Sequence, residues 1–192
     1  MANIEKQLAE RAAKRDREAF AKLYDLYVDK IYKYIYYKSG RTDEAEDLTA
    51  QVFLKAWEAI PHYRWEGYPF STWLYRIAHN QIIDYYRTHR ETLPLDTARA
   101  RESTTDPLEA AEHSFTSSQI RAALKHLTQD QQRVVILRFL EGYSTGEVAA
   151  IMDKDPDAIR ALQHRALRAL QPWMSDEKRR QPVRQVQVAV TA

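Results

Sequence analysis

Apolar residues recur every three or four positions along most of the chain, and this period is typical of amphipathic helices. In residues 17–38 the pattern predicts one helix with a wide apolar face, which the pair Ser39-Gly40 ends. The expected inward positions are Phe20, Leu23, Tyr24, Tyr27, Ile31, Tyr34 and Ile35.

A second helix is expected from Thr42 to just before Pro61. Thr42 is placed as its N-cap, because a threonine hydroxyl can accept from the free amides of a first turn. Acidic residues fill that first turn, where they suit the positive end of the helix dipole. The expected buried positions are Ala45, Leu48, Val52 and Ala56.

Residues 61–70, PHYRWEGYPF, are too rich in Pro and Gly for a helix and predict a loop. A third helix is expected from Ser71, as N-cap, to about Arg90. Phe70 is expected to pack back onto Tyr75 across that cap.

The pattern changes at residues 92–118, where Thr, Ser, Pro and acidic residues dominate and apolar periodicity is weak. This composition indicates a flexible acidic linker between two domains. The expected division is therefore a first domain at 1–91, the linker at 92–118, a second domain at 119–172 and a mobile tail at 173–192.

Two capping boxes mark helix starts in the second domain, Thr128 with Gln131 and Ser144 with Glu147. A last helix is expected at Asp155-Pro156, with Asp as N-cap and Pro at the first helical position. Two helices joined by so short a turn predict a helix–turn–helix, which places its second helix in the major groove of DNA. The fold class is therefore all-α, with two small helical domains and a helix–turn–helix in the second.

Composition supports this picture. Among 192 residues there are 4 Gly and no Cys, which favours helix and excludes disulfides and thiolate metal sites. No apolar run approaches a membrane span and no signal peptide opens the chain, so we expect a cytoplasmic protein without membrane insertion. Residues 92–118 carry 2 basic and 5 acidic side chains, whereas residues 119–192 carry 12 and 8. The basic excess thus lies with the helix–turn–helix, as a phosphate partner requires.

The outer face of the last helix carries residue types that read DNA. Arg and Gln pair with guanine and adenine edges, Arg also binds phosphate, and a small Ala allows close approach. The alternative is an ordinary solvated basic face, but the two consecutive capping boxes favour DNA binding. The candidate residues are Arg160, Ala161, Gln163, His164, Arg165 and Arg168.

Aromatic residues are dense around the 61–70 loop, and aromatic rings near basic and amide groups can stack unpaired bases. For Trp57, Trp73 and Tyr75, which fall on helices, a core position is the better interpretation. For Trp65 and Tyr68, contact with DNA and simple loop packing are evenly balanced. The following helix adds a polar stripe at Arg76, Asn80, Asp84 and Arg87.

The acidic face of the second helix, taken alone, indicates no more than a solvated surface. No pattern supports catalysis, because the sequence contains no phosphate-binding Gly loop, no nucleophile with a matching base and no metal-ligand cluster. We therefore expect a protein that is not an enzyme and needs no cofactor or metal.

The order of these pieces resembles one family. DEAEDLTAQVFLKAWEAI, then FSTWLYRIAHNQIIDYYR, then an acidic linker and the helix–turn–helix are together similar to the extracytoplasmic-function group of bacterial sigma factors. The resemblance covers about residues 17–172. It implies a transcription initiation factor with core RNA polymerase and promoter DNA as partners. An anti-sigma factor is common in that family, although nothing in this sequence identifies one.

The resemblance also implies roles for individual segments. The second helix would dock on the clamp helices of the largest polymerase subunit, and the second domain would contact the flap of the second-largest subunit. The docking residues would be Asp43, Glu44, Asp47, Gln51 and Leu54. The −10 element would be recognised and melted by Trp65, Glu66, Gly67, Tyr68, Arg76, Asn80 and Asp84. The last helix would read the −35 element.

The chain departs from the family pattern in an unusually aromatic loop, in Asp153 where many relatives have Gly, and in the tail after Trp173. Asp tolerates the left-handed conformation that this turn requires better than most residues do. Two other readings stay open at this point. One is a repressor or activator that binds DNA without polymerase, and the other is a pure interaction module.

Overall fold

The computed structural model describes residues 2–65, 67–90 and 109–180, and within these ranges every regular element is a helix. The N-terminal domain contains α1 (Ala2–Ala13), α2 (Arg17–Ser39), α3 (Thr42–Ala59), the short 3-10 turn η1 (Ile60–His62) and α4 (Phe70–Arg90). The C-terminal domain contains α5 (Glu109–Leu124), α6 (Gln129–Val135), the π-helical turn η2 (Ile136–Leu140), α7 (Thr145–Met152) and α8 (Pro156–Arg180). The all-α, two-domain prediction is confirmed.

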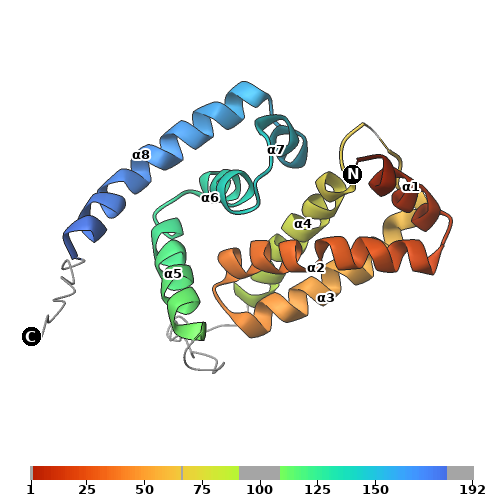
Figure 1. Ribbon diagram of the computed structural model, residues 1–192, viewed down its shortest axis with the longest axis horizontal. Coiled ribbons are helices and arrows are strands. Elements are labelled where there is room, and N and C mark those ends of the chain that lie inside the picture. The colour runs from red at the N-terminus through yellow and green to blue at the C-terminus, as the bar shows by residue number, and fades with distance from the viewer. Residues whose placement is uncertain (1, 66, 91–108, 181–192) are drawn as a thin grey trace, which may run out of the picture.

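Helices α2, α3 and α4 pack against one another, and α1 crosses one end of this bundle beside the start of α4 (Figure 1). The predicted inner face of α3 is confirmed, since Ala45, Leu48, Val52 and Ala56 are fully buried. On α2 the prediction was wrong at two positions: Phe20 is only partly buried and Tyr24 is 42% exposed. Both rings lie against α3 aromatics, Phe20 on Trp57 and Tyr24 on Phe53, at the edge of the core.

Two predicted caps of the N-terminal domain were wrong. Arg41 is the N-cap of α3, with extended backbone and no side-chain cap bond, and Thr42 is already helical. Helix α4 begins at Phe70, one residue before the predicted cap Ser71. Its first amide instead donates to the Glu5 carboxylate of α1 at 2.6 Å. Phe70 packs on Tyr27, Tyr63 and Trp73 rather than Tyr75, because the start of α4 faces α1 and the loop.

The predicted capping boxes of the C-terminal domain are confirmed. Both capping boxes are present, with Thr128 and Ser144 each accepting from the amide three residues on. Gly142 takes positive φ after η2, as a chain reversal after a helix requires.

Helix extends further than the predicted domain limits at both ends of the C-terminal domain. Helix α5 begins at Glu109, inside the expected linker, and α8 continues through Pro172 to Arg180, inside the expected mobile tail. Ala and Glu favour helix at 109–112, and a proline removes one amide donor without always ending a long helix. Residues 91–108 and 181–192, the rest of the expected linker and tail, lie outside the described residues.

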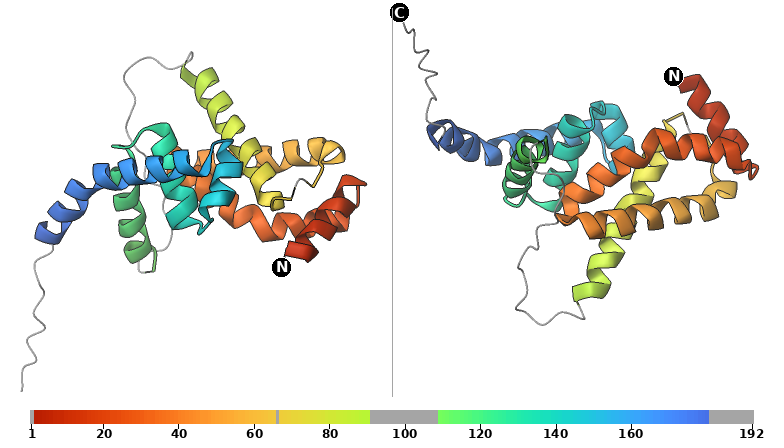
Figure 2. Two further views of the ribbon diagram at one scale, coloured as in Figure 1. Left: turned by 90° about the horizontal axis from the view of Figure 1, so that it is seen from above. Right: turned by 60° about the horizontal axis from the view of Figure 1, so that its bottom comes forward.

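The two domains share an interface in which α7 packs on α4 and η2 packs on α2. Tyr75 of α4 lies at its centre, edge-on to Tyr34 of α2 and to Tyr143 of the C-terminal domain, with ring centroids 5.2 and 5.3 Å away. The distal part of α8 extends away from both domains in every view (Figures 1 and 2). No helix in the described part of the chain is long and apolar enough to cross a bilayer.

Candidate nucleic-acid and polymerase interfaces

Helices α7 and α8 form the predicted helix–turn–helix. Asp153 ends α7 in the left-handed conformation, φ 54° and ψ 51°, and the Lys154 amide donates to the Ala149 carbonyl at 3.0 Å. Helix α8 then begins at Pro156, and on its inner face Ile159 and Ala166 are fully buried while Leu162 and Leu170 are partly buried. The expectation that Asp can take the place of Gly in this turn is confirmed.

The outer face of α8 presents most of the predicted −35 residues to solvent, namely Arg160, Ala161, His164, Arg165 and Arg168. Arg160 pairs with Asp157 one turn earlier, and Arg165 Nε donates to the Ala161 carbonyl at 3.3 Å. Gln163 differs from the rest. It is half-buried and accepts at 3.4 Å from Arg138 Nε, so one of its groups is already engaged within the domain.

The loop after α3 encloses a cavity of about 210 Å³ with the first turns of α4. Its walls combine aromatic and basic side chains: His62, Tyr63, Arg64, Tyr68, Pro69, Thr72, Trp73 and Arg76. Tyr68 is 49% exposed, and Gly67 takes φ 84°, a conformation that suits glycine. Rings and cations around an open cavity can hold an unstacked base.

The other predicted −10 residues are not gathered at this cavity. Trp65 is half-buried and lines a neighbouring hollow on α1. Asn80 lines a separate cleft between α4 and the C-terminal domain, and Asp84 pairs with Arg87 at 3.0 Å. Glu66 lies outside the described residues.

Six lining residues were not among the predicted −10 residues, namely His62, Tyr63, Arg64, Pro69, Thr72 and Trp73. One signal was available, since Thr72 and Trp73 precede Arg76 by four and three positions and so share its face of α4.

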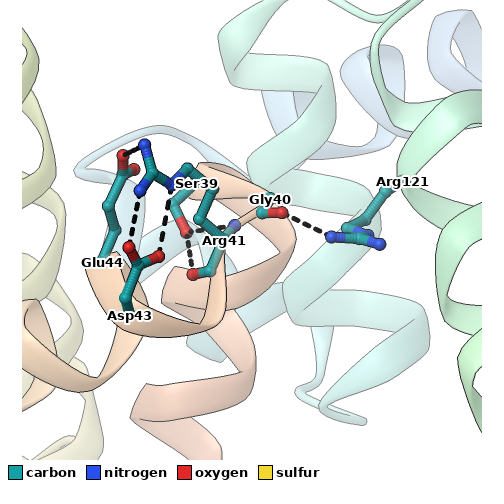
Figure 3. Close-up of polar contacts among 6 residues, drawn as sticks. All are labelled: Ser39, Gly40, Arg41, Asp43, Glu44 and Arg121. Atoms are coloured by element: carbon teal, nitrogen blue, oxygen red, sulfur yellow. Dashed lines mark hydrogen bonds and ion pairs between the residues drawn. The ribbon is translucent and has the colours of Figure 1, made fainter. Parts of the chain in front are cut away.

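The acidic start of α3 is held in place by Arg41 (Figure 3). The Arg41 guanidinium donates to Asp43 at 2.6 Å and lies 3.2 Å from a Glu44 oxygen. Hydrogen bonds from Arg41 hold the pKa of Asp43 below its usual range. Further along the helix Asp47 is exposed and Leu54 is 59% exposed. A single exposed leucine is common on protein surfaces, so the docking role of this face stays a prediction.

Gln51 lies at the edge of the same face. It is exposed and is placed to accept from Gln81 of α4 at 3.4 Å. The five predicted docking residues therefore occupy one helix, and Gln51 and Glu44 also contact side chains of α4.

The domain interface covers part of the predicted −10 surface. Arg76 Nη2 donates to the Ala150 carbonyl of α7 at 2.6 Å. Asn80 shares its cleft with Ile151, Met152 and Asp153. Both side chains nevertheless remain exposed, so α7 contacts this part of α4 without burying it.

Polar contacts hold the other side of the interface. Arg121 of α5 donates to the Gly40 carbonyl at 2.5 Å (Figure 3). Its guanidinium also lies 4.7 Å from the Tyr36 ring centroid. Lys38 donates to Gln129 at 3.1 Å. Burial lowers the pKa of Lys38 to about 8.

His79 of α4 also faces this interface. Burial lowers the pKa of His79 to about 4, and the positive charges of Arg133 and Lys38 act in the same direction while Asp130 opposes them. Because Arg133 and Asp130 belong to α6, these charges act on His79 only while the domains are together.

Comparison with known proteins decides between the readings left open by the sequence. A family model for Sigma-70 region 2 matches residues 23–92, and one for Sigma-70, region 4 matches residues 117–170. The chain is 38% identical over 176 residues to the ECF RNA polymerase sigma factor BldN of Streptomyces coelicolor, covering 90% of this chain and 67% of that protein. It is 32% identical over 165 residues to the sigma factor SigX of Bacillus subtilis, covering 82% and 84%.

The chain belongs to the ECF group of sigma factors. It therefore binds core RNA polymerase, recognises promoter DNA at −10 and −35 elements and promotes melting for initiation. Its relatives are transcription regulators rather than enzymes.

Solved structures support the fold. CnrH, in complex with the cytosolic domain of CnrY, gives a TM-score of 0.73 at 21% identity, covering 90% of this chain and 98% of that one. RpoE of Bartonella quintana, in complex with the anti-sigma factor NepR, gives 0.64 at 23% identity, covering 81% and 96%.

Proposed function

We propose that the two domains of this sigma factor divide promoter recognition, with α8 reading the −35 element in the major groove. Supporting this, Arg160, Arg165 and Arg168 lie on the solvent side of a helix whose opposite side is fixed in the core. Ala161 leaves room between the arginines for the helix to approach the bases. Gln163 contributes once DNA competes with Arg138 for its amide.

The loop cavity receives an unpaired base of the −10 element. Tyr68 and Trp73 offer rings on which a base can stack, and Arg64 and Arg76 supply positive charge for the flanking phosphates. Stacking outside the duplex offsets the cost of unpairing, and the loop thereby promotes melting. Asn80 and Asp84 continue the same helix and extend the surface that meets DNA.

Helix α3 docks on the clamp helices of the largest polymerase subunit, and the C-terminal domain contacts the flap of the second-largest. The carboxylates at Asp43, Glu44 and Asp47 orient the approach, and Leu54 is the apolar anchor at the centre. Arg41 preorders the first two carboxylates, which reduces the entropy lost on binding.

The arrangement with α7 on α4 is the inactive form of the protein. It engages Arg76 with the Ala150 carbonyl, places Asn80 in a cleft beside α7, and holds the −10 and −35 surfaces in one fixed relation. Binding to polymerase and promoter requires the domains to separate. An anti-sigma factor that spans both domains would stabilise the closed form, in the way that linkage favours the state a ligand binds.

The observation that carries the division of roles is the exposed basic face of α8, opposite an inner face on which Ile159 and Ala166 are fully buried. The test uses holoenzyme on promoters altered at one element at a time. Replacing Arg160 and Arg165 by Ala is expected to weaken binding about 10- to 100-fold per lost base contact on the intact promoter. On a promoter with a scrambled −35 element, the same variant should bind with the affinity of the wild-type protein. Lys125→Ala, an exposed change in the same domain, is the control.

If binding of the double variant still depended on the −35 sequence, α8 would not be the helix that reads it. A variant that no longer binds core polymerase would contradict the division of roles between the domains.

A further inference from the structure

The cleft that Asn80 lines is a hollow of about 250 Å³ where the two domains meet. Both domains contribute to its walls. Helix α4 contributes Arg76, His79 and Asn80, α6 contributes Arg133, and the end of α7 contributes Ile151, Met152 and Asp153. We refer to it as the interdomain cleft.

Arg133 reaches the interdomain cleft from α6 as a buried cation without an anionic partner. It is only 6% exposed, and its Nε has no hydrogen-bond acceptor in the part of the chain that the structure describes. Asp130 of the same helix pairs with Lys154 at 3.4 Å instead. Burial raises the pKa of the neighbouring Tyr34 hydroxyl, so that group is neutral. Because a guanidinium removed from water is costly unless an opposite charge compensates it, this position suits an anion.

Helix α4 supplies further donors on the other side of the cleft. Arg76 Nη2 donates to the Ala150 carbonyl at 2.6 Å, and since a guanidinium has five N–H groups, others are left for a ligand. Asn80 is exposed and its amide can donate. His79 Nδ1 is buried and has no hydrogen-bond partner among the described residues. The cleft therefore holds donors from both domains.

The balance of charge around the cleft is positive. Arg76 and Arg133 oppose one carboxylate, that of Asp153, among the described lining residues. Lys38 of α2 is a third cation nearby. Burial lowers the pKa of Lys38 to about 8, the charge of Arg133 lowers it further, and Asp130 opposes that effect. A bound anion would offset the repulsion among these cations.

Phosphate is the anion that these donors fit best. Arginine pairs with phosphate through parallel N–H groups, in short charge-assisted hydrogen bonds. Arg76 and Arg133 approach from different domains, and the tetrahedral oxygens of phosphate accept from more directions than the two of a carboxylate. The hollow admits an oxyanion, since one water takes up only about 30 Å³ in the liquid. Ile151 and Met152 add an apolar wall, which suits a short organic group on the phosphate.

We propose that the interdomain cleft binds a small phosphate-bearing anion, free phosphate or a phosphate monoester, between Arg133 and the α4 residues Arg76 and Asn80. Because the ligand contacts both domains, it binds the closed arrangement in preference to the open one. It therefore shifts the protein toward the closed form by linkage. Its effect on initiation rests on the proposed inactivity of the closed form, whereas its binding does not.

The first test is equilibrium dialysis of the full chain against labelled inorganic phosphate, with sodium chloride keeping the ionic strength constant. One phosphate per chain is expected. Arg133→Gln should raise the Kd about 10- to 150-fold, because a charge-assisted hydrogen bond is lost. Thermal unfolding without phosphate checks that this variant is folded.

A second variant changes affinity in the opposite direction. Asp153→Asn removes the carboxylate from the lining and should lower the Kd. It keeps the fold, because Asn also tolerates the left-handed backbone at this position. Lys125→Gln, an exposed loss of one positive charge in the same domain, is the control and should bind phosphate as the wild type does.

Closure is measured separately, by resonance energy transfer between dyes on Cys introduced at exposed Ala50 of α3 and exposed Ala169 of α8. The measurement uses Arg121→Ala protein, which loses the contact to Gly40 across the interface and so populates the open form. A ligand confined to the closed form, at ten times its Kd, should raise the closed-to-open ratio about elevenfold. Methyl phosphate is titrated in parallel, and the compound that acts at the lower concentration is the preferred chemical form.

Absence of phosphate binding would overturn the proposal, as would equal binding by wild type, Arg133→Gln and Asp153→Asn. Binding that leaves energy transfer unchanged would also overturn it, because the ligand would then not join the domains. Failure of the proposed inactive form is distinguishable. If phosphate raised transfer through Arg133 while affinity for core polymerase stayed the same, the site would stand and the closed form would not be inactive.

Discussion

Replacement of Arg121 by Ala is expected to open the two domains. The side chain makes a charge-assisted hydrogen bond to the Gly40 carbonyl and lies over the Tyr36 ring. Such a bond contributes about 1.5–3 kcal/mol and a partly exposed cation–π contact about 0.5–1 kcal/mol. Both partners lie in the other domain. The lost interaction energy therefore weakens the contact between the domains and leaves the folding stability of each domain unchanged.

Arg121 is only half-buried and the Gly40 carbonyl can bind water once the domains part, so the lower end of the range applies. A loss of about 2 kcal/mol shifts the closed-to-open ratio by roughly 30-fold. We propose that the open form is the one that binds polymerase, and on that basis we expect apparent affinity for core to rise toward the same factor, until the open form predominates.

Resonance energy transfer between the domains measures this directly. The chain has no native cysteine, so exposed Ala50 on α3 and Ala169 on α8 can be changed to Cys and labelled without competing sites. Transfer should fall in the Arg121→Ala protein. Arg87→Ala, which removes an arginine paired within the N-terminal domain, should leave transfer unchanged. Transfer that stays at the wild-type value in Arg121→Ala would refute the reasoning about closure.

Three further outcomes follow from the same structure. Trp65→Ala should impair promoter opening, measured by permanganate reactivity, more than closed-complex binding; an equal effect on both would assign the ring to loop structure. Leu48→Ala should destabilise the N-terminal domain by about 2–5 kcal/mol in denaturant unfolding, because the side chain is fully buried, and a loss below about 1 kcal/mol would contradict that burial. Because closure depresses the pKa of His79 to about 4 from its ordinary value near 6.5, the closed form binds fewer protons, so closure is favoured above pH 6.5 and is lost as pH falls toward 4. Interdomain transfer should therefore fall between pH 7 and 5 in wild type and change less in His79→Gln.

Local signals explain what the sequence predicted well. The two capping boxes depend only on residues three apart, and the α3 face repeats strongly apolar residues at helical spacing. Family resemblance supplied the promoter and polymerase roles, which no local pattern shows.

The missed features depend on distant partners. Helix α1 buries Leu8, Ala9 and Ala12, and two alanines give almost no apolar signal. The start of α4 is set by Glu5, 65 residues earlier in the chain. Closure of the domains depends on pairs such as Arg121 with Gly40, which no periodicity can indicate. The hollow that Trp65 lines was missed for the same reason, since one of its walls is α1.

We conclude that this chain directs core RNA polymerase to promoters. The most direct test is transcription in vitro with purified protein, sigma-free bacterial core polymerase and a pool of genomic promoter fragments. We expect discrete transcripts that form only when the protein is present. Their start sites should share two upstream elements. Specific binding of fragments without polymerase, together with no transcripts, would contradict it and point instead to a repressor or activator.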